Sequence, residues 1–374
     1  TFIGEHFESN SLFKKENPGV GSLLKMERFS DFDNILFRYI EHSELVRIAD
    51  KGNTFPAPRL RNGKLNISAL LDKYYNGNSI VFNSIFRFDK EIKKITEMLG
   101  ASLASTVQAN LYLTPANGQA FATHYDAHDV IVIQLVGRKS WHIYNKPDGL
   151  LFPISIDRSL TPERLEESKL SHNLDFDVGS TLYLPRGFPH KAVSQNQPSL
   201  HITFSLAPYT SGDVLKQFVD IIQNVNPVFR KNFSPSLLEL DDFSAVFSDI
   251  QKVLEEAFSN EDLKNELVFQ MKRKLVEDVS FLPASFIDGD INHYEFIKFV
   301  DRAHFDFLEK DSKYRVSNFQ EEILISESEY LIFQALVEQR RFAITEILTV
   351  LGDSGKKFIY SLISLGIAEF DSRH

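Results

Sequence analysis

The chain has 374 residues and 43% of them are hydrophobic, so domain-size trends predict two or three domains with packed cores. It contains no cysteine, which excludes disulfide bonds, thiolate metal sites and a cysteine nucleophile. The formal net charge of −10 argues against a broad nucleic-acid-binding surface, because such a surface needs Lys and Arg to neutralise phosphates. A local basic groove stays open.

The sequence also lacks the signals of a membrane or secreted protein. No window approaches the roughly 18 uninterrupted apolar residues of a membrane span. Residues 1–15 lack the basic-then-apolar order of a signal peptide. We therefore expect a soluble, cytoplasmic protein without membrane contact.

The first hundred residues combine helical periodicity with frequent turn signals. Apolar residues at helical spacing over 29–48 predict an amphipathic helix, with Ser30 or Asp31 as its N-cap. The other elements expected here are a short helix leading into an extended piece (4–18), a loop (51–64), a short helix (68–75), a strand (79–88) and a helix ending at Gly100 (91–99).

The middle of the chain is rich in short strands. Residues 130–136, VIVIQLV, are almost wholly apolar, as expected of a strand buried on both sides. Gly137 and Arg138 predict a tight turn after which 139–144 returns as a strand. The other elements predicted here are strands over 107–113, 181–185 and 199–207, an extended segment over 121–126, and a polar excursion over 150–174 with a helical piece at 162–168. Short strands with Gly, Pro and Asn turns predict a sandwich or barrel of the jelly-roll kind.

After Pro208 the spacing of apolar residues changes to that of helices. Residues 213–225, 243–257 and 261–279 carry apolar side chains at helical spacing, which predicts a helical subdomain of the kind that often forms a homodimer contact. A third unit is predicted beyond Pro283, where residues 326–370 indicate three short helices and a final strand, a pattern typical of a winged helix. Its basic doublets are few, which favours a protein contact over DNA binding: Arg340, Arg341, Lys356 and Lys357.

Three residues in the strand-rich part predict a metal site. His124 and Asp126 are two apart in an extended segment, so both side chains leave one face. His190 follows a Pro-Arg-Gly turn and could supply a third ligand from a neighbouring strand of a barrel. Two imidazoles and one carboxylate form the facial set of non-haem Fe(II) oxygenases, with open positions for a cosubstrate and dioxygen. The alternative for a bare His-x-Asp pair is a solvated polar pair near a turn.

Three motifs carry a resemblance to a known family: NLYLTP, HYDAHDVIVIQLVGRKSW and LYLPRGFPHKAVS. They resemble the JmjC-type 2-oxoglutarate oxygenases, and most closely the cupin-like ribosomal oxygenases, over about residues 77–208. The resemblance implies an α+β chain with a double-stranded β-helix (jelly-roll) catalytic domain over 1–210, a helical dimerisation domain over 211–285 and a winged-helix-like domain over 286–374.

The resemblance also implies roles for individual residues. His124, Asp126 and His190 would bind Fe(II), and Lys139 would pair with the distal carboxylate of 2-oxoglutarate. A buried dicarboxylate needs such a cation, although a surface hairpin lysine is the alternative for Lys139. Further contacts to the cosubstrate are expected from Asn110, Thr203 and Ser205.

Other roles are expected for the remaining polar residues near these motifs. Arg138 is expected to face solvent, and Tyr125 to border the substrate groove. His201 either lines the pocket or is a hydrogen-bonded core histidine. Ordinary structural roles are expected for His128 and His142, and no ligand context surrounds His6, His42, His172, His293, His304 or His374.

The predicted activity is hydroxylation of an unactivated C–H bond by an Fe(II)- and 2-oxoglutarate-dependent dioxygenase. The resemblance implies a protein or peptide substrate, such as an Arg or His side chain of a ribosomal protein. A small molecule or biosynthetic peptide is the alternative substrate, and histone demethylation is disfavoured because no methyl-lysine pocket is evident. The competing class is a non-catalytic cupin-like binding module, against which the complete ligand set argues.

Overall fold

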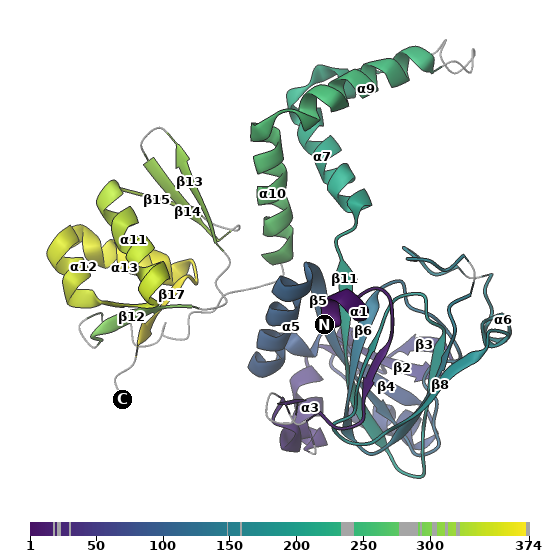
Figure 1. Ribbon diagram of the computed structural model, residues 1–374. Coiled ribbons are helices and arrows are strands. Elements are labelled where there is room, and N and C mark those ends of the chain that lie inside the picture. Colours follow the sequence, from purple (N-terminus) through teal and green to yellow (C-terminus); the bar gives the residue numbers. More distant parts are fainter. Residues whose placement is uncertain are drawn as a thin grey trace. The chain divides into compact units, whose positions relative to one another are not determined.

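The computed structural model describes residues 1–371 apart from 18, 21–23, 30, 148, 158, 233–242, 277–290, 292–293, 301–304, 311–312 and 319–321. The chain divides into two compact units, Thr1–Pro208 and Tyr209–His374, which are described separately below (Figure 1). None of the helices in the described part of the chain is both long and apolar enough to cross a membrane.

The first unit combines helices and strands. Its helices are α1 (Phe2–Glu5), α3 (Phe32–Tyr39), α4 (Ile67–Tyr75), α5 (Lys90–Leu103) and α6 (Pro162–Glu166), with 3₁₀ turns η1 (Met26–Phe29), η2 (Ser43–Leu45) and η3 (Ile85–Arg87). Its strands are β1 (Leu12–Lys14), β2 (Val46–Asp50), β3 (Asn53–Pro56), β4 (Ser79–Phe82), β5 (Ser105–Thr114), β6 (Asp129–Val136), β7 (Lys139–Tyr144), β8 (Leu170–Phe176), β9 (Thr181–Leu184), β10 (His190–Ser194) and β11 (Ser199–Pro208).

These strands form two antiparallel sheets. Among the described residues, eight strands make a large sheet in the order β1-β9-β6-β11-β5-β4-β2-β3, and three make a small sheet in the order β10-β7-β8. The long strand β11 lies at the centre of the large sheet and pairs with β5 on one side and β6 on the other. The predicted jelly-roll core is therefore present, with helices added to it.

Alternation along the central strands separates two environments. On β11, Leu200, Ile202 and Phe204 enter a large apolar core that also holds side chains of α3, α4 and α5. The intervening Thr203 and Ser205 face a cavity between the sheets. Since neighbouring side chains of a strand point to opposite faces, one strand serves both the core and the cavity.

The helices on the core side begin at well-formed caps. The side chains of Asp31, Asn66 and Asp89 accept hydrogen bonds from backbone N–H groups in the first turns of α3, α4 and α5. The buried Asp89 also accepts from Arg28 and Arg38, at 2.8 and 2.9 Å. Burial alone would raise the pKa of Asp89, but the N–H of Ile92 and the two guanidinium groups hold it below its usual value.

Three predictions in the first hundred residues are wrong in part, one of them the strand expected over 79–88, which ends at Phe82 and is followed by the 3₁₀ turn η3. The helix expected over 29–48 stops at Tyr39, and 46–50 is strand β2, in which buried Val46 and Ile48 flank exposed Arg47. Alternation therefore overrode helical spacing there. The helix expected to end at Gly100 continues to Leu103. Gly100 allows a close approach within it, since a Cβ there would lie only 2.9 Å from the carbonyl oxygen of Ser105. Ser30, one of the two expected caps, lies outside the described residues.

Two predictions for the strand-rich part are corrected by the observed strands. Strands β6 and β7 follow each other across Gly137 but lie in different sheets, so they do not form a hairpin. The segment 121–126, predicted as extended, is part of no strand in the described chain, and its β-pairing there is an isolated bridge from His124 to His190. The expected excursion over 150–174 ends earlier, since 170–176 is strand β8.

The second unit contains a helical part and a mixed part. The helical part holds α7 (Ser211–Val225), η4 (Pro227–Arg230), α9 (Ser244–Phe258) and α10 (Glu261–Val276). The mixed part holds β12 (Phe296–Phe299), β13 (Asp306–Lys310), β14 (Lys313–Ser317), β15 (Glu322–Ile325), α11 (Glu327–Gln339), β16 (Arg341–Ala343), α12 (Ile344–Leu351), α13 (Asp353–Ser364) and β17 (Ala368–Asp371). Several positions named in the sequence analysis lie outside the described residues. They are the end of the helix predicted over 261–279, Pro283, the predicted boundary at 285, His293, His304 and His374.

The mixed part contains the three helices and final strand predicted for 326–370. Its apolar core gathers side chains of α11, α12, α13 and the sheet β16-β12-β17. Arg341 is engaged in this fold, with its guanidinium 3.9 Å from the Phe296 ring and 2.7 Å from a carboxylate oxygen of Asp371. Arg340 lies 4.7 Å from the ring of Phe299. This basic doublet is thus tied to the domain's own residues.

The Gly137 turn, which carries the chain from the large sheet to the small one, yields a stability prediction. Gly137 has φ +70, and a Cβ there would lie 2.0 Å from the carbonyl oxygen of Pro198. Gly63 has φ +84, but a Cβ at that position would meet nothing within 4 Å. Gly63→Ala should therefore cost only the left-handed backbone penalty of about 1–2 kcal/mol, and Gly137→Ala about 1–3 kcal/mol more for the steric clash.

Urea unfolding followed by fluorescence measures this difference, since the chain's one tryptophan, Trp141, is buried in the first unit. Equal losses in the two variants would show that the Pro198 carbonyl moves aside freely.

Candidate metal centre and its pocket

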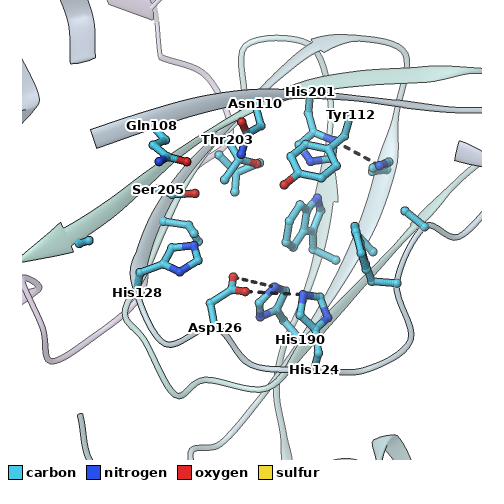
Figure 2. Close-up of a pocket in the computed structure, with 18 of the residues that line it drawn as sticks. Gln108, Asn110, Tyr112, His124, Asp126, His128, His190, His201, Thr203 and Ser205 are labelled. Carbon is cyan, nitrogen blue, oxygen red and sulfur yellow. Dashed lines mark hydrogen bonds and ion pairs between the residues drawn. The ribbon is translucent and has the colours of Figure 1, made fainter. Parts of the chain in front are cut away.

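A cavity of about 460 Å³ lies between the two sheets of the first unit. Strands of both sheets line it, and Figure 2 shows the polar side chains that point into it. The lining residues are Thr106, Gln108, Asn110 and Tyr112 from β5; Val130 and Val132 from β6; Lys139 and Trp141 from β7; His190 and Ala192 from β10; His201, Thr203, Ser205 and Ala207 from β11; and Ala120, Phe121, His124, Asp126 and His128.

The three predicted metal ligands meet in this cavity. His190 begins β10, and its backbone N–H donates to the carbonyl of His124 at 2.7 Å, while the N–H of His124 donates back at 3.1 Å. The N–H of Gly187 donates to the backbone carbonyl of Asp126 at 3.0 Å. Gly187 has φ +84 and no room for a Cβ, which would lie 2.6 Å from the Leu150 carbonyl oxygen. The Pro-Arg-Gly turn therefore positions both sides of the site.

The donor atoms converge on one point. Nε2 of His124 lies 3.9 Å from one carboxylate oxygen of Asp126, and Nε2 of His190 lies 3.8 Å from the other (Figure 2). In each histidine Nδ1 bonds the backbone carbonyl two residues earlier, at 2.9 Å for His124 and 3.0 Å for His190. A carbonyl only accepts, so Nδ1 carries the proton and Nε2 presents its lone pair to the site. This donor set fits a divalent metal ion.

The electrostatics of the three residues agree with that role. Burial alone would raise the pKa of Asp126, but His124 and His190 keep it below its usual value, so the carboxylate stays ionised. Burial and the neighbouring His124 lower the pKa of His190 to about 4, so this imidazole is neutral near pH 7. One anionic and one neutral ligand are the states in which these groups bind metal.

Lys139 is the second unusual feature of the cavity. Its side chain is 1% exposed and has no acidic partner among the described residues. Its ammonium donates to the hydroxyl of Thr114 at 2.9 Å and contacts Nδ1 of His201 at 3.1 Å. Burial lowers the pKa of Lys139 to about 7 and, together with the Lys139 charge, lowers that of His201 well below its usual value. A cation that is so buried and unpaired is suited to an anionic ligand.

A polar wall on β5 and β11 faces these groups. Figure 2 places Gln108, Asn110, Thr203 and Ser205 together on this wall. The side-chain oxygen of Asn110, Oδ1, accepts a hydrogen bond from the backbone N–H of Ser84 at 2.9 Å, which fixes the orientation of the side-chain amide. The wall therefore offers hydroxyl and amide groups but no charge.

Aromatic rings complete the cavity between the wall and the metal ligands. Tyr112 stacks on His201 at 4.8 Å, and burial and the Asp126 charge raise the pKa of the Tyr112 hydroxyl to about 12. Trp141 stacks on His190 at 5.7 Å. The buried Nε1–H of Trp141 has no hydrogen-bond partner within the described part of the chain. A donor without an acceptor in a ligand-sized cavity fits a bound molecule that supplies one.

Most of the residues singled out from the sequence lie where the motifs led us to expect, and two do not. His124, Asp126, His190, Lys139, Asn110, Thr203 and Ser205 all line the one cavity, and His201 does as well. Tyr125 does not border a groove: it is 2% exposed and packs against Leu150 and Leu165. His128 is not merely structural, because it lines the cavity beside Asp126 (Figure 2).

Gln108, Tyr112 and Trp141 were not predicted as cavity residues. Alternation gave a usable signal, since Gln108 and Tyr112 are each two residues from Asn110, and Trp141 is two from Lys139. The surface alternative for Lys139 is excluded by its burial. Arg138 is exposed, as expected, and pairs with Asp177.

This two-sheet barrel, with two imidazoles and a carboxylate at one cavity, has the architecture of a cupin-like JmjC domain, and the JmjC domain model matches residues 82–214. This match places a JmjC-type domain within residues 82–214 and agrees with the resemblance found in the motifs.

Curated relatives support this placement. The chain is 31% identical over 214 residues to the bifunctional lysine-specific demethylase and histidyl-hydroxylase NO66 of Dictyostelium discoideum, covering 54% of this chain and 40% of that protein. It is 34% identical over 226 residues to ribosomal oxygenase 1 of Gallus gallus, covering 58% of this chain and 36% of that protein. The chain thus spans two fifths or less of the length of these relatives.

Solved structures share the fold. The chain is similar to the Escherichia coli ribosomal oxygenase YcfD with a TM-score of 0.57 and 12% identity, over 99% of this chain and 97% of that one. A structure of YcfD in complex with cobalt and 2-oxoglutarate matches over the same shares with a TM-score of 0.54 and 12% identity.

The buried ammonium of Lys139 predicts a pH dependence of dicarboxylate binding. Because burial lowers its pKa to about 7, Lys139 is protonated below that pH and increasingly neutral above it in the free protein. An anion must then recruit the missing proton. Affinity for 2-oxoglutarate, titrated calorimetrically with Mn(II) present, should be flat below pH 7 and fall by up to about tenfold per pH unit above it.

Lys139→Met serves as the control, since it keeps most of the length of the side chain without the charge. Its affinity should be low and should lose that fall above pH 7. Equal wild-type affinities at pH 6 and pH 9 would contradict the lowered pKa.

Proposed function

We propose that this chain is an Fe(II)- and 2-oxoglutarate-dependent dioxygenase that hydroxylates an unactivated C–H bond. One observation carries the proposal: a single cavity holds both a convergent His-Asp-His donor set and a buried lysine with no acidic partner in the described chain. The first feature suits a divalent metal and the second a carboxylate. The match of residues 82–214 to the JmjC domain supports the same combination.

In this proposal His124, Asp126 and His190 hold the iron. The Nδ1 hydrogen bonds of the two histidines keep their Nε2 atoms directed at the metal position, and the carboxylate supplies one negative charge. Three protein ligands leave other positions of the ion open for a cosubstrate and dioxygen. The side chains thereby restrict both exogenous ligands to one side of the ion.

Lys139 anchors the far carboxylate of 2-oxoglutarate. Thr114 and the neutral His201 orient its ammonium, so the cation is in place before the cosubstrate enters. Asn110, Thr203 and Ser205 provide further polar contacts on the facing wall. When bound, iron and 2-oxoglutarate supply the oxidising chemistry, in which dioxygen converts the cosubstrate to succinate and CO₂ while one oxygen atom enters the substrate.

We infer a protein side chain as the substrate, as the names of the histidyl-hydroxylase and ribosomal oxygenase relatives suggest. Among the lining residues the acidic one is Asp126, which the metal would occupy. A guanidinium would thus find no counter-charge, whereas the uncharged wall around Gln108 and Ser205 suits a neutral polar group. This favours His over Arg. A small molecule or biosynthetic peptide is the alternative substrate, but no contact in the described cavity specifically favours it.

The competing function is a cupin-like module that binds a ligand without catalysis. Such a module would not need a buried cation beside a complete metal donor set, and both are retained here. The enzyme is therefore the interpretation that uses every charged group of the cavity.

The second unit is proposed to make protein contacts. Exposed apolar side chains on α7 and α9 support a homodimer contact of the helical part: Leu215, Val225, Phe247 and Phe258. The winged-helix-like part is proposed to bind protein, not nucleic acid, because its Arg340-Arg341 doublet is engaged with its own aromatic and acidic groups. A cytoplasmic location stays a prediction.

An anaerobic titration tests the activity. Adding Fe(II) and 2-oxoglutarate to the protein should give a weak visible charge-transfer band, and admitting air should give succinate. Asp126→Ala should abolish both signals, because it removes the charged ligand. His142→Ala is the matched control, since His142 adjoins the cavity residue Trp141 in sequence but does not line the cavity, and it should retain both signals. Neither band nor succinate from the wild type would refute the enzyme.

The role of Lys139 is separable from that of the metal ligands. Lys139→Ala should raise the 2-oxoglutarate concentration needed for half-maximal turnover by about 100-fold, as expected for loss of a buried charged pair worth about 3 kcal/mol, and should change the Fe(II) requirement far less. Equal effects on both requirements would remove Lys139 from this role.

The substrate can be found without prior assumption. Mass spectrometry of ribosomal proteins and peptides from cells with and without the gene should reveal a gain of one oxygen atom on a side chain. A gain on Arg in place of His would contradict the charge argument.

A further inference from the structure

The segment that carries two of the proposed metal ligands is held by few backbone bonds. Residues 121–128 form no strand, and their backbone pairing with β10 is limited to the isolated bridge between His124 and His190. An open segment of this kind keeps more freedom than a strand held by a ladder. Side chains that fasten the segment from outside can therefore add to what the bridge does in setting the spacing of the two imidazoles.

The excursion between β7 and β8, residues 145–169, supplies such fasteners. The hydroxyl of Tyr125 accepts a hydrogen bond from the N–H of Asp157 at 2.6 Å, and its ring packs against Leu150 and Leu165. This contact holds the excursion against the residue that lies between His124 and Asp126. The function proposed above leaves the excursion without a role.

A second fastener comes from α6 of the same excursion. One carboxylate oxygen of Glu166, Oε1, accepts hydrogen bonds from both the hydroxyl of Thr123 and the ammonium of Lys191, the latter at 2.8 Å. Thr123 immediately precedes His124, and Lys191 immediately follows His190. A single oxygen atom thus links the neighbours of the two imidazole ligands across the isolated bridge.

The burial of these groups indicates which bond matters. Thr123 is 2% exposed, and a buried hydroxyl needs a partner, which Glu166 provides. Lys191 is partly exposed and Glu166 is exposed, so their ion pair by itself contributes little to stability. Its effect is local: it holds the carboxylate over Thr123.

We propose that Glu166 is a positioning residue of the metal centre, which sets the spacing of His124 and His190 by bridging Thr123 and Lys191. Glu166 is not itself a ligand, since the donor group found among the described residues consists of His124, Asp126 and His190. The proposal rests on the metal site proposed above. Side chains that orient metal ligands typically change metal affinity by about 10- to 100-fold when removed.

Cobalt(II) titration of the full chain tests the proposal, because the visible absorption of the bound ion reports both its affinity and its coordination geometry. Glu166→Ala should weaken Co(II) binding by about tenfold and alter the absorption band. Glu166→Gln keeps an oxygen acceptor for Thr123 and should recover most of the affinity. Glu167→Ala is the matched control, because Glu167 is the adjacent acid and its side chain is exposed, and it should change neither signal.

A double-mutant cycle identifies the route. If Glu166 acts through the Thr123 hydroxyl, Thr123→Val should weaken Co(II) binding by a similar factor, and combining it with Glu166→Ala should add little. Circular dichroism on each variant distinguishes a local effect from unfolding. Should Glu166→Ala unfold, Thr123→Val and Glu166→Gln still give the comparison.

The outcomes separate this inference from the proposed function. A wild-type protein that binds no Co(II) overturns the metal site and the inference with it. A wild type that binds Co(II), with folded Glu166→Ala binding it equally well, overturns the inference alone. Equal weakening by Glu167→Ala would also overturn it, because the excursion as a whole, not the Glu166 bridge, would then position the ligands.

Discussion

The central strands of the large sheet must satisfy two environments at once, and the site depends on that constraint. On β11 the apolar Leu200, Ile202 and Phe204 are buried in the core shared with the helices, while the alternate residues face the cavity. The helical layer thereby holds the strand rigidly from behind. Because the apolar core stabilises the strand, the polar groups on its other face need not bond to other protein groups and remain available to a ligand.

Charge decides what that cavity can accept. Asp126 is kept ionised by neighbouring imidazoles, and Lys139 is held by a hydroxyl and a neutral histidine, without a carboxylate of its own in the described chain. The two charged groups belong to different segments and do not neutralise each other. A metal ion bound at Asp126 and an anion bound at Lys139 would each place an opposite charge beside that buried group.

Local patterns predicted individual elements well where one period dominated. Residues 130–136 are a buried strand, and 67–75 and 211–225 are helices close to the predicted bounds. The prediction failed where helical and strand periodicity overlapped, as at Val46 and Ile48. It also failed at Gly137, because a turn signal does not reveal whether the next strand pairs with the one before it or crosses to another sheet. Pairing depends on residues far away in sequence, so a local window does not contain it.

The sequence by itself determined the chemistry: the residue types and order of His124, Asp126, Lys139 and His190 indicated a metal donor set with a cation, and the motifs around them indicated the JmjC family. Only the tertiary structure decided that Lys139 is buried without an acid among the described residues, that Tyr125 packs away from the cavity, and that Glu166 bonds to the neighbours of both histidines. The physical reason is that burial and contacts between segments arise only when distant strands pack around one cavity. The residue types that can bind a metal, in contrast, are read directly from the sequence.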